Sequence, residues 1–312
     1  MTKTQSLSSN KIKRRRKETA AFYLYISPFL IGFGVFTVVP MIASLWFSFN
    51  RIGIFSFVEG DYKFVGFANY ISVLKDNNFF YLALRNTFVF SICKVLFGTL
   101  IALAIALLLN RKMFGKKLVR TLVYIPSVIP IVGAAVIWRQ LFDGRSSILS
   151  WLLSFVGITV ESSKWLGEFG LMSAIIMSVV TSIGPTMIMI LAALQQVPKE
   201  LIESADIEGA NPWQKFIHIT LPCISSVLFY LVLTGFISAL QAYAEVDLLI
   251  GSLASNSMTM SQLVMYYYDD WQIGLGYSSS LAWLVFIVIG IFSIIVFKNS
   301  KKMVFFQGDD EL

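Results

Sequence analysis

Six long apolar segments constrain the fold of this 312-residue chain more than any other feature of its sequence. A helix needs about 20 mostly apolar residues to cross the hydrocarbon core of a bilayer. Segments of that length lie at roughly 21–49, 84–109, 119–141, 171–194, 219–248 and 277–297. Apolar residues make up 56% of the chain, whereas about half or less is usual in a soluble domain. The sequence therefore predicts an all-α polytopic membrane protein with six transmembrane helices.

The distribution of basic residues predicts the orientation of these helices. Lysines and arginines are concentrated at the start of the chain, between the second and third segments, and after the sixth. Because positively charged loops stay on the cytoplasmic side, both termini and the polar loop 195–222 are expected in the cytoplasm. We expect a basic cytoplasmic arm (1–20), a transmembrane domain (21–298) and a cytoplasmic tail (299–312). The net charge of +7 then reflects membrane orientation, and no nucleic-acid partner is expected.

The 195–222 loop is long and patterned for a connection between two membrane helices. Pro198 suits the first position of a helix, because the N–H that it lacks would be unsatisfied there. A short helix is therefore predicted from Pro198 to Glu208. Gly209 can then adopt the left-handed backbone that ends a helix.

A second helix is predicted directly after this turn. Asn211 supplies an N-cap and Pro212 a first helical position, and the helix is expected to run through His218. The loop as a whole is predicted to be a helix, a sharp turn and another helix. His218 is the single histidine of the chain, and we expect no catalytic role for it.

The same loop carries a recognisable pattern. The run Glu203-Ser204-Ala205, with Gly209 six residues after the glutamate and Leu221-Pro222 at the end, resembles the signature loop of ABC-transporter permeases of the binding-protein-dependent import class. Further matches point to the sugar-importer branch of that family, which includes maltose permeases. They are Tyr25–Pro40, Val65–Tyr70, Asn86-Thr87, Leu109–Arg111 and Arg120–Pro126. The resemblance extends over about residues 20–300. The chain differs from the family pattern at Glu208, where aspartate is usual.

The resemblance implies a coupling role for the loop. In this family the loop forms the coupling helix, which sits in a cleft of a cytoplasmic ATPase. Carried over to this sequence, the ATPase-coupling residues are Glu203, Ser204, Ala205, Asp206, Glu208, Gly209 and Ala210. The alternative is an ordinary helical hairpin whose acidic residues simply face water.

The resemblance also implies the composition of a transporter. The chain would be one permease of a heterodimer in a prokaryotic cytoplasmic membrane, with two ATPase subunits, an extracellular solute-binding protein and surrounding lipid. No cofactor or metal is expected on this chain, because ATP and Mg²⁺ would bind to the ATPase subunits. The sequence has no GxxxxGK[ST] phosphate-binding loop, so the chain is not expected to be an enzyme. The solute would be a sugar or oligosaccharide, with glycerol phosphate or another polar solute as the alternative.

Polar and small residues in the fourth and fifth apolar segments are candidates for the solute pathway. Sugars need hydrogen-bonding groups and aromatic faces, and the resemblance implies that the translocation cavity follows these two helices. The candidates are Ser178, Thr181, Ser182, Pro185, Thr186, Gly235, Ser238, Gln241 and Tyr243. Ser238 and Gln241, three apart, would share a helix face. The alternative is close packing between helices, for which small residues are also suited; Gly184-Pro185 is expected to loosen its helix.

Few charged residues lie within the apolar segments. Lys94 falls midway along the second segment and must face protein or water, because a charge at the bilayer centre is costly. Two interpretations are open: contact with a partner acid or with the solute in the cavity, or a lysine that snorkels or pairs with another helix. Glu245 and Asp247 close the fifth segment, either as interfacial caps or as contacts for a binding protein.

Two other classes of protein are less favoured. A secondary transporter usually needs carboxylates or histidines within the membrane as relays, and only Lys94 lies clearly within a span. A membrane-embedded enzyme would need a motif such as HExxH or paired intramembrane carboxylates, and the sequence has neither. Cys93 and Cys223 lie at different depths, so neither a disulfide nor a metal site is expected.

Overall fold

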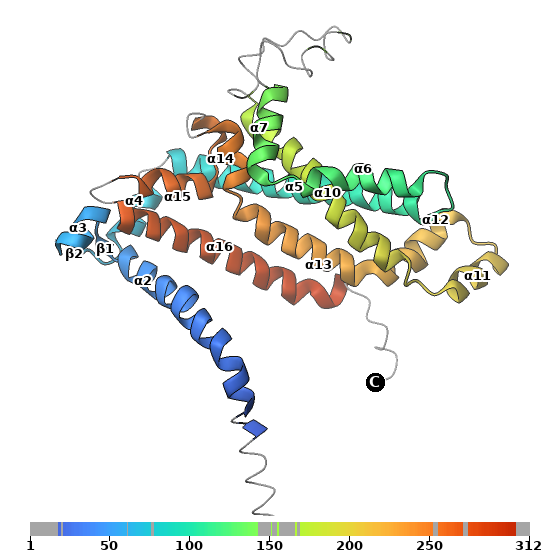
Figure 1. Ribbon diagram of the computed structural model, residues 1–312, viewed down its shortest axis with the longest axis horizontal. Coiled ribbons are helices and arrows are strands. Elements are labelled where there is room, and N and C mark those ends of the chain that lie inside the picture. Colours follow the sequence, from blue (N-terminus) through green and yellow to red (C-terminus); the bar gives the residue numbers. More distant parts are fainter. Residues whose placement is uncertain are drawn as a thin grey trace, which may run out of the picture.

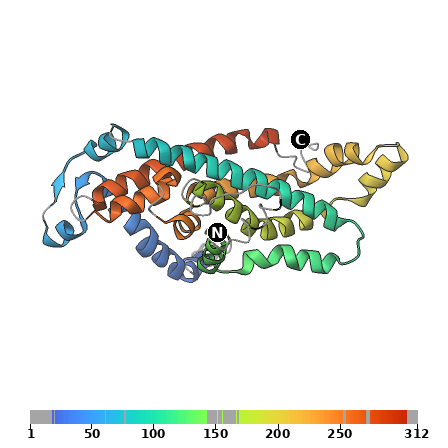
Figure 2. The same cartoon turned by 90° about the horizontal axis from the view of Figure 1, so that it is seen from above.

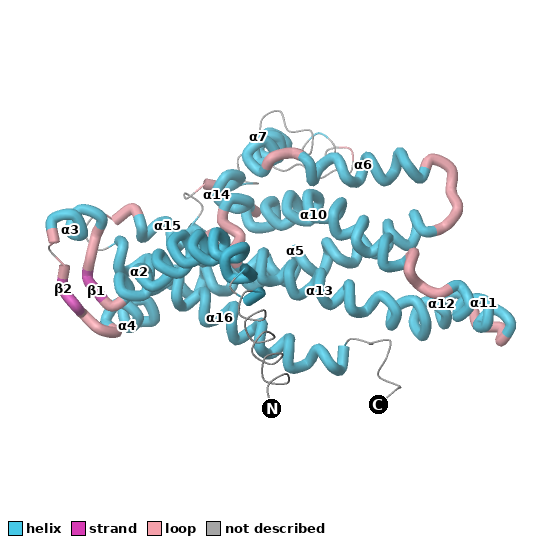
Figure 3. The backbone as a smooth tube through the Cα atoms, turned by 60° about the horizontal axis from the view of Figure 1, so that its bottom comes forward, coloured by secondary structure: helices cyan, strands magenta, loops and turns pink. Residues whose placement is uncertain are grey.

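The computed structural model describes residues 18–19, 21–60, 62–75, 78–142, 151, 155, 166, 169–251, 255–270 and 274–303. Most of these residues are helical (Figures 1 and 3). The expectations for the basic arm, for the connection between the third and fourth segments and for the end of the tail fall almost entirely outside the described residues.

Within the described part of the chain, five helices are long and apolar enough to cross a membrane. They are Ala21–Ser48, Phe79–Asn110, Gly170–Leu194, Pro212–Leu240 and Gly274–Asn299. The bent pair Lys116–Val128 and Ile131–Phe142 supplies a sixth crossing if it counts as one span. The predicted all-α membrane protein is confirmed, with five continuous helices and one bent pair in place of six continuous helices.

The prediction that the third span, 119–141, is a single helix is wrong. α6 (Lys116–Val128) and α7 (Ile131–Phe142) meet at an angle of 100°. Ile129, between them, has an extended backbone with φ −70° and ψ 126°. The ring of Pro130 favours this conformation in the residue before it, and Pro130 has no N–H with which to continue a helix.

The fifth predicted span, 219–248, is also too long. α13 (Leu221–Leu240) is followed by a turn and by a separate short helix, α14 (Ala244–Ile250). The N–H of Gln241 donates to the carbonyl of Ser238 at 3.3 Å, which tightens the last turn of α13. The chain continues through η4 (Ser255–Ser257) and α15 (Met260–Tyr268). Glu245 and Asp247 therefore belong to α14 and do not close a long span.

The first span stands apart from the bundle (Figure 1). It begins at Ala21 and includes the π-helical turn η1 (Gly34–Val38) and α2 (Val39–Ser48), and 0% of its most apolar 18-residue window is buried. Its main contact within the described residues is α16 (Gly274–Met303), where Trp283 Nε1 donates to Ser44 Oγ at 3.3 Å. Its exposed apolar surface requires a cover of lipid or protein.

The centre of the bundle is formed by α5 (Asn78–Asn110), α10 (Gly170–Leu194) and α13, which run along the long axis of the molecule (Figure 2). Small residues allow these helices to approach closely. An ideal Cβ on Gly98 of α5 would lie 3.1 Å from Ser182 Oγ of α10, and one on Gly235 of α13 would lie 3.3 Å from a Val95 methyl of α5. Such contacts are typical of membrane helix interfaces.

α10 is one continuous helix through Gly184 and Pro185. The pair does not break the helix, and because Pro185 has no N–H one bond to the preceding turn is missing there. Gly184 packs against α6, where an ideal Cβ would lie 3.0 Å from both Tyr124 Cα and Ser127 Oγ. The missing side chain at Gly184 thus brings two helices together.

One end of the long axis carries a small cap formed by the antiparallel strands β1 (Asn50–Arg51) and β2 (Lys63–Phe64) and the helices α3 (Ile54–Glu59) and α4 (Ala68–Lys75) (Figure 1). Asn50 pairs with Phe64, and Arg51 with Lys63. Asn69 Nδ2 donates to the carbonyls of Ser48 and Asn50 at 2.8 and 2.9 Å. These bonds tie the cap to the end of the first span. The opposite end carries α11 (Lys199–Ile207) and α12 (Pro212–Lys215).

Candidate functional site

The first half of the 195–222 loop forms a short exposed helix, α11, and a sharp turn. Pro198 is the N-cap, with φ −59° and ψ 130°, so its prediction as the first helical residue is wrong by one position. Gly209 has φ +77°. Its N–H donates to the carbonyl of Asp206 at 3.1 Å, and the N–H of Ala210 donates to that of Ala205 at 2.9 Å. The predicted left-handed glycine that ends the helix is confirmed.

The second half of the loop begins as predicted and does not end as predicted. Asn211 Oδ1 accepts from Gln214 N, and Gln214 Oε1 accepts from Asn211 N, both at 2.9 Å, which is a capping box. The helix does not end at His218, because α12 continues through the π-helical turn η3 (Phe216–Thr220) into α13. An ion pair between Lys215 and Asp206 joins the two halves of the loop.

The two faces of α11 differ. Ala205 is buried, and Ile202 packs against the cluster that contains Leu194 and Val197. The other predicted coupling residues are exposed, apart from the half-buried Ala210; they are Glu203, Ser204, Asp206, Glu208 and Gly209. Ile207 is 89% exposed beside them, and Trp213 of α12 is 67% exposed. The loop thus presents acidic and large apolar side chains together.

Lys94 is paired with a carboxylate on another helix, as one of its two interpretations predicted. Its Nζ donates to Glu245 Oε1 at 2.8 Å and to Oε2 at 2.7 Å. Ser178 Oγ of α10 donates to the same Glu245 Oε2 at 3.2 Å. Glu245 therefore neither caps a long span nor is free to contact a binding protein. From the sequence, only Lys94 is predicted to lie clearly within a span. The pair corrects this, because the carboxylate of Glu245 lies beside Lys94 inside the bundle.

The predicted pathway residues of α10 make local contacts and line neither of the two hollows described below. The hydroxyls of Thr181, Ser182 and Thr186 donate to carbonyls of their own helix at 2.9 to 3.2 Å. Pro185 is exposed. Gly235 on α13 contacts Val95. For Ser182 and Gly235 the structure favours the packing interpretation.

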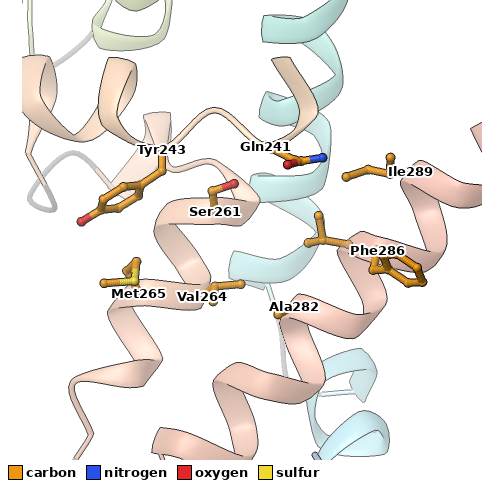
Figure 4. Close-up of a pocket in the computed structure, with 9 residues that line it drawn as sticks. Gln241, Tyr243, Ser261, Val264, Met265, Ala282, Phe286 and Ile289 are labelled. Atoms are coloured by element: carbon orange, nitrogen blue, oxygen red, sulfur yellow. The ribbon is translucent and has the colours of Figure 1, made fainter. Parts of the chain in front are cut away.

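Gln241 and Tyr243, in contrast, line a groove of about 460 Å³ between the end of α13, α15 and α16. Ser261 lies between them in the close-up view (Figure 4). The rest of this part is apolar: Val264, Met265, Ala282, Val285, Phe286 and Ile289. Tyr243 and Met265 also line an adjoining part of about 490 Å³, which adds Asp247, Gly251, Met258, Gln262, Tyr266 and Asp269. We call these two parts the groove. Ser238 is exposed but does not line it.

Three polar residues that the sequence did not single out as site residues hold the elements that form the groove, and of these Gln262 also lines it. Asn86 Nδ2 donates to the carbonyls of Asn256 and Met258 at 2.8 and 3.0 Å. Thr87 Oγ1 accepts from Met260 N at 2.9 Å. Gln262 Nε2 donates to Asp247 Oδ1 at 3.2 Å. The Asn86-Thr87 pair at the start of the second apolar segment was the sequence signal for this contact. Its bonds hold η4 and α15 against α5.

Cys93 and Cys223 are free, and among the described residues no group of three or more His, Cys, Asp or Glu side chains could hold a metal ion.

The described helices define a polytopic membrane protein with an exposed helix and turn between two of its spans. The chain belongs to the family of binding-protein-dependent transport system inner membrane components, whose model matches residues 94–304.

Relatives of nearly equal length support this assignment. The chain is 31% identical to the probable ABC transporter permease protein YesP of Bacillus subtilis, over 100% of both chains. It is 31% identical to the trehalose/maltose transport system permease protein MalF of Thermococcus litoralis, over 93% of this chain and 96% of the relative. A chain in the crystal structure of a bacterial ABC transporter involved in alginate import has the same fold, with a TM-score of 0.78 and 23% identity over 94% of this chain and 99% of that chain.

Proposed function

We propose that this chain is one of two permease subunits of an ATP-driven importer that carries a sugar or oligosaccharide across the cytoplasmic membrane of a prokaryote. The family match and the full-length relatives, among them permeases for trehalose/maltose and for arabinooligosaccharides, carry the proposal. The exposed helix and turn at α11 and Gly209 add independent support, because they offer a rigid element on which a motor subunit can act.

The ATPase subunits would dock on the residues proposed for coupling, Glu203 to Ala210. α11 rests on the bundle through Ala205 and Ile202 and turns its acidic side away from it. Exposed Ile207 and Trp213 supply the apolar anchors that protein interfaces use. ATP and Mg²⁺ would bind to these partners, and closure of the ATPase pair would move α11 as a lever.

The second permease would cover the first span. That 28-residue helix is apolar and has none of its most apolar window buried within its own chain, so part of it is available to another subunit while lipid covers the remainder. The basic termini favour an orientation with both ends in the cytoplasm. The cap formed by β1, β2, α3 and α4 would then face outward, toward an extracellular solute-binding protein.

The groove is the part of the solute pathway that this chain would contribute. Gln241, Tyr243 and Ser261 offer hydrogen bonds, and Phe286 and Tyr266 offer aromatic surface. Asp247 and Asp269 line the adjoining part, and no lysine or arginine among the described residues lines either part. Carboxylates attract hydroxyl donors and repel anions, which disfavours glycerol phosphate. The α10 hydroxyls remain candidates for a later stage of transport.

Affinity purification of the tagged chain from native membranes tests the proposal. An ATPase with a phosphate-binding loop and a second permease are expected in the same complex, and the solute-binding protein expressed with them is expected to prefer neutral oligosaccharides to glycerol 3-phosphate in a thermal-shift assay. Recovery of the chain alone, with uptake that a proton ionophore abolishes and ATP does not drive, would support a secondary transporter instead.

A further inference from the structure

Lys94 and Glu245 form an ion pair inside the bundle although they lie 151 residues apart. Lys94 is the central residue of α5, and Glu245 is the second residue of α14. Their side chains are only 10% and 25% exposed. Both carboxylate oxygens accept from Nζ, and Ser178 adds a third bond from α10. One short helix is thereby attached to two long ones.

The surroundings of the pair are apolar. Phe90, Met177 and Val246 are fully buried in one cluster around it, and Lys94 Nζ lies 5.6 Å from the centre of the Phe90 ring. In such surroundings an ionised group without a partner is strongly unfavourable. α14 therefore cannot move away from α5 without leaving two uncompensated charges.

The pair also lies beside the groove. Tyr243 is two residues before Glu245 and Asp247 two residues after it, and both line the groove. The other buried residues of α14, Val246, Leu249 and Ile250, make apolar contacts, which are not directional. Two side-chain contacts of α14 specify a particular geometry. The bonds from Lys94 to both oxygens of Glu245 hold it on α5, and the bond from Gln262 to Asp247 holds it on α15.

We propose that Lys94 and Glu245 are positioning residues for transport, which fix α14 on α5 and α10 and so set the place of Tyr243 and Asp247 in the groove. The assignment rests on the proposed role of the groove in the solute pathway. Neither residue lines the groove. Residue 94 is therefore predicted to act on transport through α14.

A thiol reporter on α14 tests the proposal without a transported solute. Ala244→Cys is placed in the full chain lacking Cys93 and Cys223, in native membranes opened on both sides, and its rate of labelling by a maleimide is measured. Lys94→Met and Glu245→Gln are each expected to raise the rate about tenfold, because each removes the ion pair that holds α14 on α5. Independent effects would multiply to about a hundredfold in the double variant. The double variant is instead expected within about twofold of either single variant, since the tie is already broken.

Two controls complete the cycle. Lys94→Arg keeps the charge and the bonding to both oxygens and is expected to label at about the native rate. Phe114→Cys, in the exposed connection between α5 and α6, is expected to label equally in every background. Native rates in both single variants, or multiplying effects in the double variant, would overturn the proposal. If the single variants fail to accumulate, the proposal requires the double variant to accumulate better than either, and a lower level overturns it. A failure of the groove as the solute pathway would leave these rates unchanged and appear only in uptake.

Discussion

Gly209 is the residue on which the geometry of the 195–222 loop depends most. Its φ is +77°, and no atom outside its neighbours lies within 4 Å of an ideal Cβ. A side chain would therefore have room, and the cost of about 1 to 2 kcal/mol comes from the backbone alone. Gly209→Val is expected to leave membrane insertion intact, to misplace α11 and to abolish ATPase association. Co-purification and uptake measure both effects.

Gly209→Asn is the matched control, because asparagine tolerates the left-handed region. It is expected to retain most of the association. Equal activity of the valine and native proteins would show that the turn is not required for coupling.

Gln241 tests the solute pathway at the same scale. Gln241→Leu keeps the size of the side chain and removes its hydrogen bonds. If it lines the pathway, loss of one bond lowers the apparent affinity for the transported solute roughly two- to tenfold, while complex yield and basal ATPase activity are unchanged. Lowered yield with unchanged affinity would assign Gln241 to helix packing.

Residues that act on their own backbone could be predicted from the sequence, and residues that act through distant partners could not. Gly209 and Asn211 were predicted because glycine and asparagine have strong positional preferences at helix ends. Lys94 was expected to need a partner, but an isolated lysine in an apolar helix does not show which carboxylate reaches it. Glu245 was assigned to the end of a long span because the fifth apolar segment was predicted to extend to residue 248.

At the scale of elements, hydropathy predicted where helices lie better than where they bend. The segments matching α5, α10 and α16 were placed nearly correctly because long apolar runs have few alternatives in a membrane. The α6–α7 bend and the early end of α13 were missed, since apolar residues continue through both. Pro130 after Ile129 was the available signal for the first bend, whereas Gln241 gives no comparable signal for the second.

Contact between α10 and α6 yields a prediction about Gly184. An ideal Cβ there would lie 3.0 Å from Tyr124 Cα, which is backbone and cannot rotate away. Gly184→Val is expected to separate the two helices and to lower stability by about 1 to 3 kcal/mol, seen as a lower melting temperature of the purified complex. Gly290→Val in α16 is the control, because no atom lies within 4 Å of an ideal Cβ at that position. Its melting temperature is expected to equal that of the native protein.

For the whole molecule, the orientation in the membrane is the prediction with the widest consequences. Ser204 on α11 and Phe64 on β2 are both exposed and lie at opposite ends of the long axis. In a chain lacking Cys93 and Cys223, Phe64→Cys is expected to react with an impermeant thiol reagent in intact cells. Ser204→Cys is expected to react only after the membrane is opened. The reverse pattern would place α11 outside and remove the basis for an ATPase contact. Phe64 is used as the outer reporter because Ser257, on the same side, is buried against Leu171 and would react poorly.

The separation of the first span from the bundle has a consequence for biosynthesis. Its main packing partner within the described chain is α16, so the first of the described spans to be synthesised contacts the last of them. The bonded pair Ser44 and Trp283 lies 239 residues apart. Until α16 emerges from the ribosome, the cap at the end of the first span is its packing partner within the described chain, and lipid must cover the rest of its apolar surface. A chain that stops before residue 274 would therefore lack the main packing partner of its first described span.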